Sequence, residues 1–269
     1  MGWNRLMEHQ LKSHAVSGTA MAVAAHPDDI EFMMAGTLLR LKEVGWKLHC
    51  MNLANGCCGS LQHDAGVTAR IREVEAREAA AILGATWHAP ITNDLEIFYN
   101  DGLLRKLAAV LREVVPDILL IHSPSDYMED HSNACRLAVS AAFVRGMTNY
   151  ATDPSKAAVQ HDVTLYHAMP HGLCDPFGDP VKPGMFVDVT GVMDVKRQAL
   201  AAHASQKDWL DTTQGMDSYL QQMEDTAVEL GQQSGRFRCA EGWRPHAHMG
   251  FCAQDANPLR DVLKPYYAT

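Results

Sequence analysis

The sequence lacks three features that would each indicate a particular class of protein. Its seven cysteines include no C-x-x-C pair, which argues against a cysteine zinc knuckle, and their odd number favours free thiols in a reducing compartment. No cluster of Lys and Arg reaches five and the formal net charge is −9, so we expect no nucleic-acid or anionic-membrane partner. No apolar run approaches the roughly 18 residues of a membrane span, and no apolar segment follows the first residues as in a secretory leader. These absences predict a cytoplasmic protein.

The bulk composition is that of a globular chain. Hydrophobic residues make up 47% and charged residues 20% of 269 residues, enough for one large α/β domain or two small ones. We find no internal repeat and no linker-like shift in composition, so we predict a single domain over residues 1–269. The 14 histidines are numerous and raise the question of a metal site.

Short apolar runs alternate with segments of helical periodicity, which predicts an α/β fold with a mostly parallel sheet flanked by helices. The second half is less regular, and we expect it to form a decorated C-terminal part. The predicted strands cover 19–25, 47–53, 85–88, 117–122, 162–168 and 185–189. The predicted helices cover 29–44, 68–83, 102–115, a segment that begins near Asp130, 192–204 and 216–230.

Three polar side chains follow the first predicted strand in the run Ala25-His26-Pro27-Asp28-Asp29. Open α/β sheets bind their ligands beyond the carboxyl ends of such strands. Pro27 biases His26 away from helical geometry, so His26 and Asp29 can converge while Asp28 projects differently. Polar groups beside a buried strand are costly unless something satisfies them, and a divalent cation would do so.

A third ligand is expected from the loop that follows the strand at 117–122, because parallel strands deliver their trailing loops to one edge of the sheet. That loop is acidic and ends in Asp130-His131. His26, Asp29 and His131 would form a two-histidine, one-carboxylate triad, which suits zinc and equally non-haem iron(II). The alternative is that Asp28 and Asp29 only stabilise the N-terminus of a helix, by about 0.3–1 kcal/mol each, and that His131 is only a residue at the start of the next helix. Because these residues occur together at two neighbouring strand ends, we favour the metal site.

The same residues carry a resemblance to a known family. The A-H-P-D-D motif, the Gly36-Thr37 pair and the distal Asp130-His131 resemble the LmbE-like (PIG-L) N-acetylglucosaminyl deacetylase family. The similarity continues around 72–84, 186–190 and 196–206 and so spans about residues 18 to 242. The resemblance implies a Rossmann-like fold and a zinc held by His26, Asp29 and His131, with Asp28 as general base. It further implies that Asp130 orients a ligand histidine and that Arg72 and Asp94 contact the substrate.

One position departs from the family pattern. Many members have His-Pro-Asp-His at the distal motif, where this chain has Met128-Glu129-Asp130-His131, and a thioether cannot donate a strong hydrogen bond. Tyr127 or His203 would then stabilise the developing negative charge. His203 has an alternative interpretation as a structural histidine on a helix.

Two further segments gave weaker signals. Cys57 and Cys58 lie in a Gly-rich loop where small side chains suffice without any catalytic thiol. The run from Trp243 to His248 is a candidate lid or second metal patch, and we favour plain surface.

The sequence therefore predicts a zinc-dependent hydrolase that removes an N-acyl group, most simply N-acetyl, from an amino sugar or its conjugate. The alternative is a metal-dependent hydratase or lyase that adds water to a small unsaturated carboxylic acid on the same scaffold. A third class, a binding module without catalysis, would hold no metal. Small α/β hydrolases are often symmetric assemblies, which leaves a homo-oligomer open.

Overall fold

A mixed eight-stranded sheet forms the centre of the described part of the chain. The computed structural model describes residues 17–206, 209–210 and 219–269. Within these ranges the strand order is β3-β2-β1-β4-β5-β7-β6-β8. The strands are β1 (Thr19–Ala24), β2 (Lys47–Asn52), β3 (Thr86–His88), β4 (Ile118–Ile121), β5 (Thr164–Ala168), β6 (Met185–Asp188), β7 (Ala240–Pro245) and β8 (Tyr267–Ala268). The pairs among β1, β2, β3, β4 and β5 are parallel. The pairs β5–β7, β7–β6 and β6–β8 are antiparallel.

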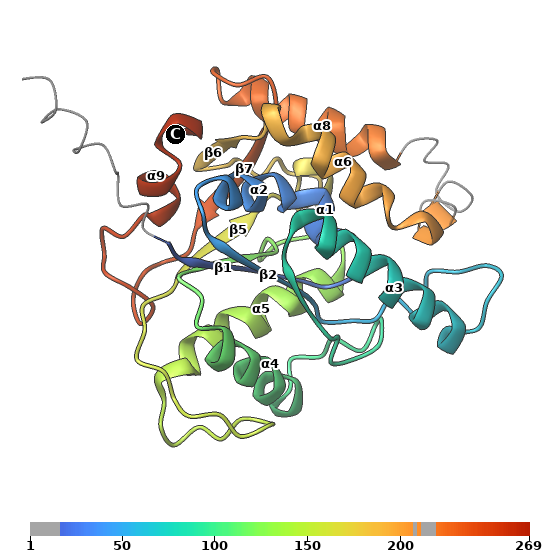
Figure 1. Cartoon of the computed structure of the whole chain (residues 1–269), viewed down its shortest axis with the longest axis vertical. Helices are drawn as coiled ribbons and strands as arrows, with labels where there is room; N and C mark the ends of the chain where they lie inside the picture. Colours follow the sequence, from blue (N-terminus) through green and yellow to red (C-terminus); the bar gives the residue numbers. More distant parts are fainter. Residues whose placement is uncertain (1–16, 207–208, 211–218) are drawn as a thin grey trace, which may run out of the picture.

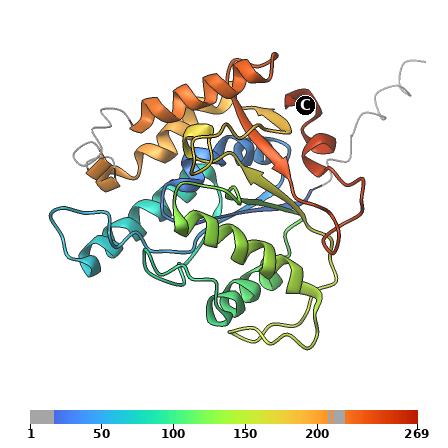
Figure 2. The ribbon, with the colours of Figure 1, turned by 180° about the vertical axis from the view of Figure 1, so that it is seen from behind.

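Helices cover both faces of the sheet, as Figures 1 and 2 show. Along β1 the side chains alternate: Ala20 and Ala22 pack with the core on one face, and Met21 and Val23 with the core on the other. The main helices are α1 (Asp29–Met33), α2 (Ala35–Glu43), α3 (Ala65–Leu83), α4 (Asp101–Val114), α5 (Glu129–Phe143), α6 (Met193–Ala201), α8 (Tyr219–Gln233) and α9 (Pro258–Val262). Helices α4 and α5 cover one face, and α2 and α6 cover the opposite face. The α/β prediction is confirmed.

The predicted continuous helix over 29–44 is wrong, because it breaks at Met34 into α1 and α2. Met34 has φ −130°, outside the helical region. The buried carboxylate of Glu241 accepts hydrogen bonds from the backbone N–H groups of Gly36 and Thr37, at 2.8 and 2.7 Å. This carboxylate from β7 caps the start of α2 and compensates for the interrupted helical ladder.

Strand β7 was not predicted, and the prediction that the run from Trp243 to His248 is plain surface is wrong for Trp243. Trp243 is fully buried in β7 and donates to the hydroxyl of Thr37 at 2.9 Å. In the same strand, Oε1 of Glu241 lies 2.5 Å from Nζ of Lys196. Trp243 is therefore a core residue, whereas Arg244 and Pro245 are exposed.

The other predicted elements are present with shifted ends. Helix α3 begins earlier than predicted because Asp64 caps it by accepting from the N–H of Val67 at 2.9 Å. Helix α8 begins at Tyr219 in the described part, and positions 216–218 of the predicted helix lie outside the described residues. Among the described helices, none is both long and apolar enough to cross a membrane.

Candidate metal centre and pocket

The turn after β1 holds the first cluster of polar side chains at the carboxyl edge of the sheet. Asp28 adopts φ 104° immediately before α1, a backbone region that non-glycine residues rarely occupy. The N–H of His26 donates to Oδ2 of Asp29 at 2.7 Å, and the side chain of Asn52 donates to the carbonyl of His26. These bonds hold His26 and Asp29 together and turn Asp28 away from them, as the sequence predicts.

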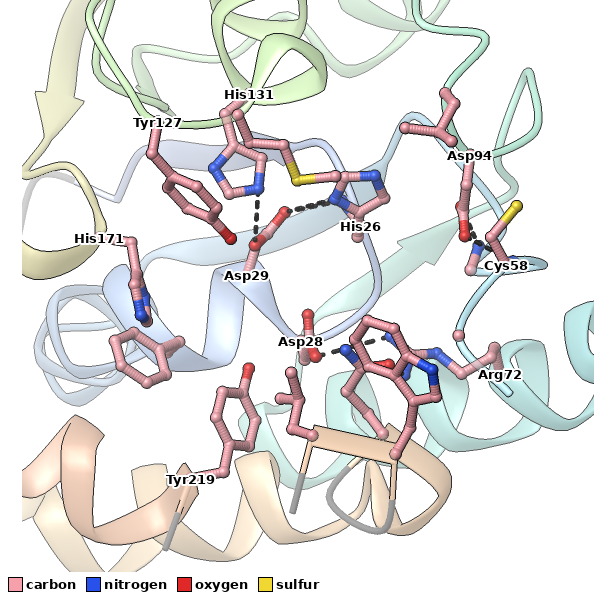
Figure 3. Close-up of a pocket in the computed structure, with 18 of the residues that line it drawn as sticks. His26, Asp28, Asp29, Cys58, Arg72, Asp94, Tyr127, His131, His171 and Tyr219 are labelled. Atoms are coloured by element: carbon pink, nitrogen blue, oxygen red, sulfur yellow. Dashed lines mark hydrogen bonds and ion pairs between the residues drawn. The ribbon is translucent and has the colours of Figure 1, made fainter. Parts of the chain in front are cut away.

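His26, Asp29 and His131 meet at one point, and their ligand atoms lie within 4.8 Å of one another. Nδ1 of His26 is 3.6 Å from Oδ2 of Asp29, and Nε2 of His131 is 3.4 Å from Oδ1 of the same carboxylate. Figure 3 shows the two rings approaching Asp29 from α5 and from the turn after β1. Two imidazoles and one carboxylate are a donor set that a zinc or iron(II) ion accepts.

In each of the two histidine rings, the nitrogen that points away from Asp29 lies within hydrogen-bond distance of another carboxylate. Nε2 of His26 lies 2.9 Å from Oδ2 of Asp130, and Nδ1 of His131 lies 3.0 Å from Oδ1 of Asp126. Each bond leaves the other ring nitrogen facing Asp29, which is the arrangement found around metal-bound histidines. Although burial lowers the pKa of His26, its bonds to Asp130 and Asp29 raise it to about 10, so the site favours a positive charge. The residues present therefore fit a divalent cation.

A third histidine lies beneath the triad and was not predicted. His122 directly follows β4, is fully buried, and its Nε2 accepts the backbone N–H of Ala25 at 2.9 Å. Its ring stacks on His131 with centroids 4.2 Å apart. Because Nε2 is an acceptor in this bond, His122 is neutral, and burial lowers its pKa. His122 thus connects the turn after β1 to the ring of His131.

Asp28 lies beside the triad among groups that orient its carboxylate. Arg72 of α3 approaches to 3.6 Å, and the hydroxyl of Tyr219 points toward Asp28 in Figure 3. Burial raises the pKa of Asp28 to about 6, against the opposing effect of Arg72. Arg72 itself donates to the carbonyl of Pro27 and to the side chain of Gln206. Its guanidinium is therefore engaged by the protein and holds the turn around Asp28.

The Gly-rich loop after β2 reaches the same pocket and is fixed by Asp94. The two carboxylate oxygens of Asp94 accept the backbone N–H groups of Gly56 and Cys58, at 2.7 and 2.8 Å. Gly56 has φ 75°, and a Cβ there would lie 2.8 Å from Nε of Arg72, so this position requires glycine. Asp94 consequently determines the shape of the loop as well as facing the pocket.

These groups open into a cavity of about 470 Å³, a volume typical of small-molecule sites. Tyr127, Met128 and His171 form one wall, and Figure 3 shows the Tyr127 hydroxyl directed toward the triad. Neither Tyr127 nor His171 makes a hydrogen bond through its side chain to another described residue. The lining also contains apolar side chains, namely Phe32, Met33, Leu95, Trp209 and Leu210.

Most of the predicted site residues converge on this pocket. The lining includes His26, Asp28, Asp29, Arg72, Asp94, Tyr127 and His131. Asp130 lies behind His26, as its predicted orienting role requires. His203 does not line the pocket: it is buried, with Nε2 3.3 Å from Oε2 of Glu31. Asp126 was not predicted as a site residue, although its position five residues before His131 places it within reach of that ring.

The chain is similar to known proteins in both sequence and fold. The PIG-L family, described as GlcNAc-PI de-N-acetylase, matches residues 21–143, and the chain belongs to this family of enzymes. Diacetylchitobiose deacetylase of Thermococcus kodakarensis is 29% identical over 231 residues, covering 83% of this chain and 81% of the relative. The 4-oxalmesaconate hydratase of Pseudomonas putida is 30% identical over 197 residues, covering 70% and 74%. The crystal structure of GalB, the 4-carboxy-2-hydroxymuconate hydratase from Pseudomonas putida, superposes with a TM-score of 0.72 at 24% identity, covering 89% of this chain and 99% of GalB.

Proposed function

We propose that this protein is a zinc-dependent hydrolase that removes an N-acyl group, most simply N-acetyl, from an amino sugar or its conjugate. The observation that carries the proposal is a buried carboxylate, Asp28, beside two histidines whose far sides are fixed by carboxylates. The deacetylases among the relatives support the same reaction class.

His26, Asp29 and His131 would hold the ion, and the alternative ion for this donor set is iron(II). When bound, zinc supplies a Lewis acid that makes water acidic near neutral pH and polarises an amide carbonyl. Asp130 and Asp126 orient the two histidine rings so that the other nitrogen of each faces the place beside Asp29 where the ion would bind.

Asp28 acts as the general base. It takes the proton of the attacking water as oxygen bonds to the acyl carbon, and it passes that proton to the amine as the C–N bond breaks. The products are a carboxylate and a free amino group. Arg72 and Tyr219 hold the carboxylate of Asp28 toward the pocket, which keeps its oxygen aligned through both proton transfers.

Tyr127 takes the place of the donor that is missing at Met128. Its hydroxyl is directed toward the triad and is uncommitted among the described side chains, so it can donate to the oxygen of the amide as negative charge develops there. Asp94, at the opposite rim, has lone pairs left after its two backbone bonds and accepts hydroxyl groups of the sugar.

The charge of the pocket favours an amide over a polycarboxylate. Among the described lining residues, the acidic side chains are Asp28, Asp29, Asp94 and Glu129, and the lysine and arginine side chains amount to Arg72. Arg72 already donates to the protein. Even with a divalent ion at the triad, these groups leave no surplus of positive charge in the pocket, so a substrate with several carboxylates would be poorly compensated.

Hydration of an unsaturated carboxylic acid is the second candidate, because hydratase activity is also named among the similar proteins. The test incubates zinc-loaded protein with a panel of N-acetylated amino sugars and, separately, with unsaturated polycarboxylates. We expect acetate and free amine from the first panel and no loss of ultraviolet absorbance from the second. Loss of the conjugated absorbance without acetate release would overturn the proposal in favour of hydration.

A further inference from the structure

Two adjacent thiols lie at the rim of the pocket, and the proposed reaction does not use them. Cys57 and Cys58 stand in the loop after β2 with their sulfur atoms 3.8 Å apart. Cys58 is exposed and lines the pocket, and Cys57 is half-buried. The carboxylate of Asp94 lies close by, so that one ligand atom from each of the three residues falls within 4.8 Å of the others.

We propose that Cys57, Cys58 and Asp94 form a second metal site, which binds a thiophilic divalent ion such as zinc or cadmium at the mouth of the pocket. A tetrahedral ion about 2.3 Å from each of two sulfurs holds them about 3.8 Å apart, which is the separation already present. The site is distinct in chemistry from the histidine triad, because its two strong donors are sulfur.

The loop is held in a conformation that suits binding. Asp94 accepts the N–H groups of Gly56 and Cys58, so the carboxylate and the backbone that carries the thiols are fixed relative to each other. Each carboxylate oxygen keeps a lone pair for the ion. Little conformational entropy then remains to be lost when the ion binds.

Coordination suits these thiols better than oxidation to a disulfide. Neighbouring residues have their Cα atoms only about 3.8 Å apart, whereas the Cα atoms of an unstrained disulfide are usually about 4.4–6.8 Å apart. A metal ion instead displaces the protons: two S–H bonds break, two sulfur–metal bonds form, and two protons pass to water.

Occupation of this site would inhibit the proposed hydrolysis. Gly56, Cys58 and Gly59 line the pocket with Asp94, and an ion among them would take the carboxylate that we assign to the sugar hydroxyls. This consequence rests on the proposed function. The binding itself does not.

The test titrates zinc-loaded protein with cadmium and follows the ultraviolet sulfur-to-cadmium charge-transfer band, to which ligands at His26, Asp29 and His131 contribute nothing. We expect a band that saturates near one equivalent in the wild type and is lost in the double variant Cys57→Ser/Cys58→Ser. The matched control is Cys174→Ser/Cys252→Ser, which removes two half-buried thiols that are not part of the site and should keep the band.

Three results would overturn the proposal. One is a band of equal intensity in the Cys57→Ser/Cys58→Ser variant. Another is the absence of a band in wild type whose free thiols have been counted by a thiol reagent. A mass lower by two hydrogens, with both thiols blocked, would identify a disulfide and would likewise overturn it. Because none of these readouts needs a substrate, failure here leaves the proposed reaction unaffected, and failure to release acetate leaves the metal site unaffected.

Discussion

The carboxylates behind the two histidines allow a quantitative prediction. Asp130 and Asp126 bond to His26 and His131 at 2.9 and 3.0 Å, and each fixes both the tautomer and the orientation of its ring. Substitution of either by Asn keeps the shape but replaces a charged acceptor with a neutral amide that has two ways to orient. Comparable changes weaken metal affinity about 10- to 100-fold, which corresponds to about 1.4–2.7 kcal/mol.

The assay is competition for zinc against a chelating dye, with purified Asp130→Asn and Asp126→Asn. We expect the dissociation constant to rise within that range in both. The control is Asp117→Asn, because Asp117 bonds to His161 at the same 3.0 Å but lies at the amino end of β4, away from the pocket. It should lose stability without losing zinc affinity. Wild-type affinity in both site variants, or an equal loss in the control, would refute the reasoning.

Three more predictions concern the pocket and the fold. Tyr127→Phe should lower kcat about 100-fold with little change in KM, because its hydroxyl is assigned to the transition state; an unchanged kcat would remove that role. Burial lowers the pKa of His167 from 6.5 to about 4, so its contribution to stability is complete above pH 6.5 and is lost as the pH falls toward 4, by about 3 kcal/mol in total. Denaturant titrations across that window should show a shallower pH dependence in His167→Gln, and an identical slope would contradict this assignment. Gly36→Ala should destabilise the fold by about 1–3 kcal/mol, because its Cβ would lie 2.4 Å from a methyl group of Val189, and a midpoint of thermal unfolding equal to the wild type would show that α2 shifts freely.

The metal triad could be predicted from the sequence because it follows from topology. His26 and Asp29 follow β1, His131 follows the loop after β4, and β1 and β4 are parallel neighbours. Parallel neighbours deliver their trailing loops to the same edge, so the convergence needs no knowledge of side-chain packing. The same rule also places His122 at that edge, although the buried bond to the N–H of Ala25 has no signature in the sequence.

The remaining features depend on contacts between distant segments. Tyr219 reaches Asp28 from a helix that is almost 200 residues away in the chain, and no local pattern marks it. Strand β7 reads A-E-G-W-R-P, without the apolar alternation of a strand, because Glu241 is buried through its bonds to Lys196 and the start of α2. The break between α1 and α2 at Met34 also depends on Glu241, which accepts the N–H groups at the start of α2. Tertiary partners, which the sequence does not display, decide these positions.

The most direct test of the account compares wild type and Asp28→Asn in one experiment that measures bound zinc and acetate release from an N-acetylated amino sugar. We predict that the variant keeps as much bound zinc as the wild type, because Asp28 is not among the three ligands, and that its turnover falls about 10²- to 10⁴-fold. Retained turnover would contradict the assignment of Asp28 as the base. Loss of zinc together with activity would show that Asp28 belongs to the metal site instead.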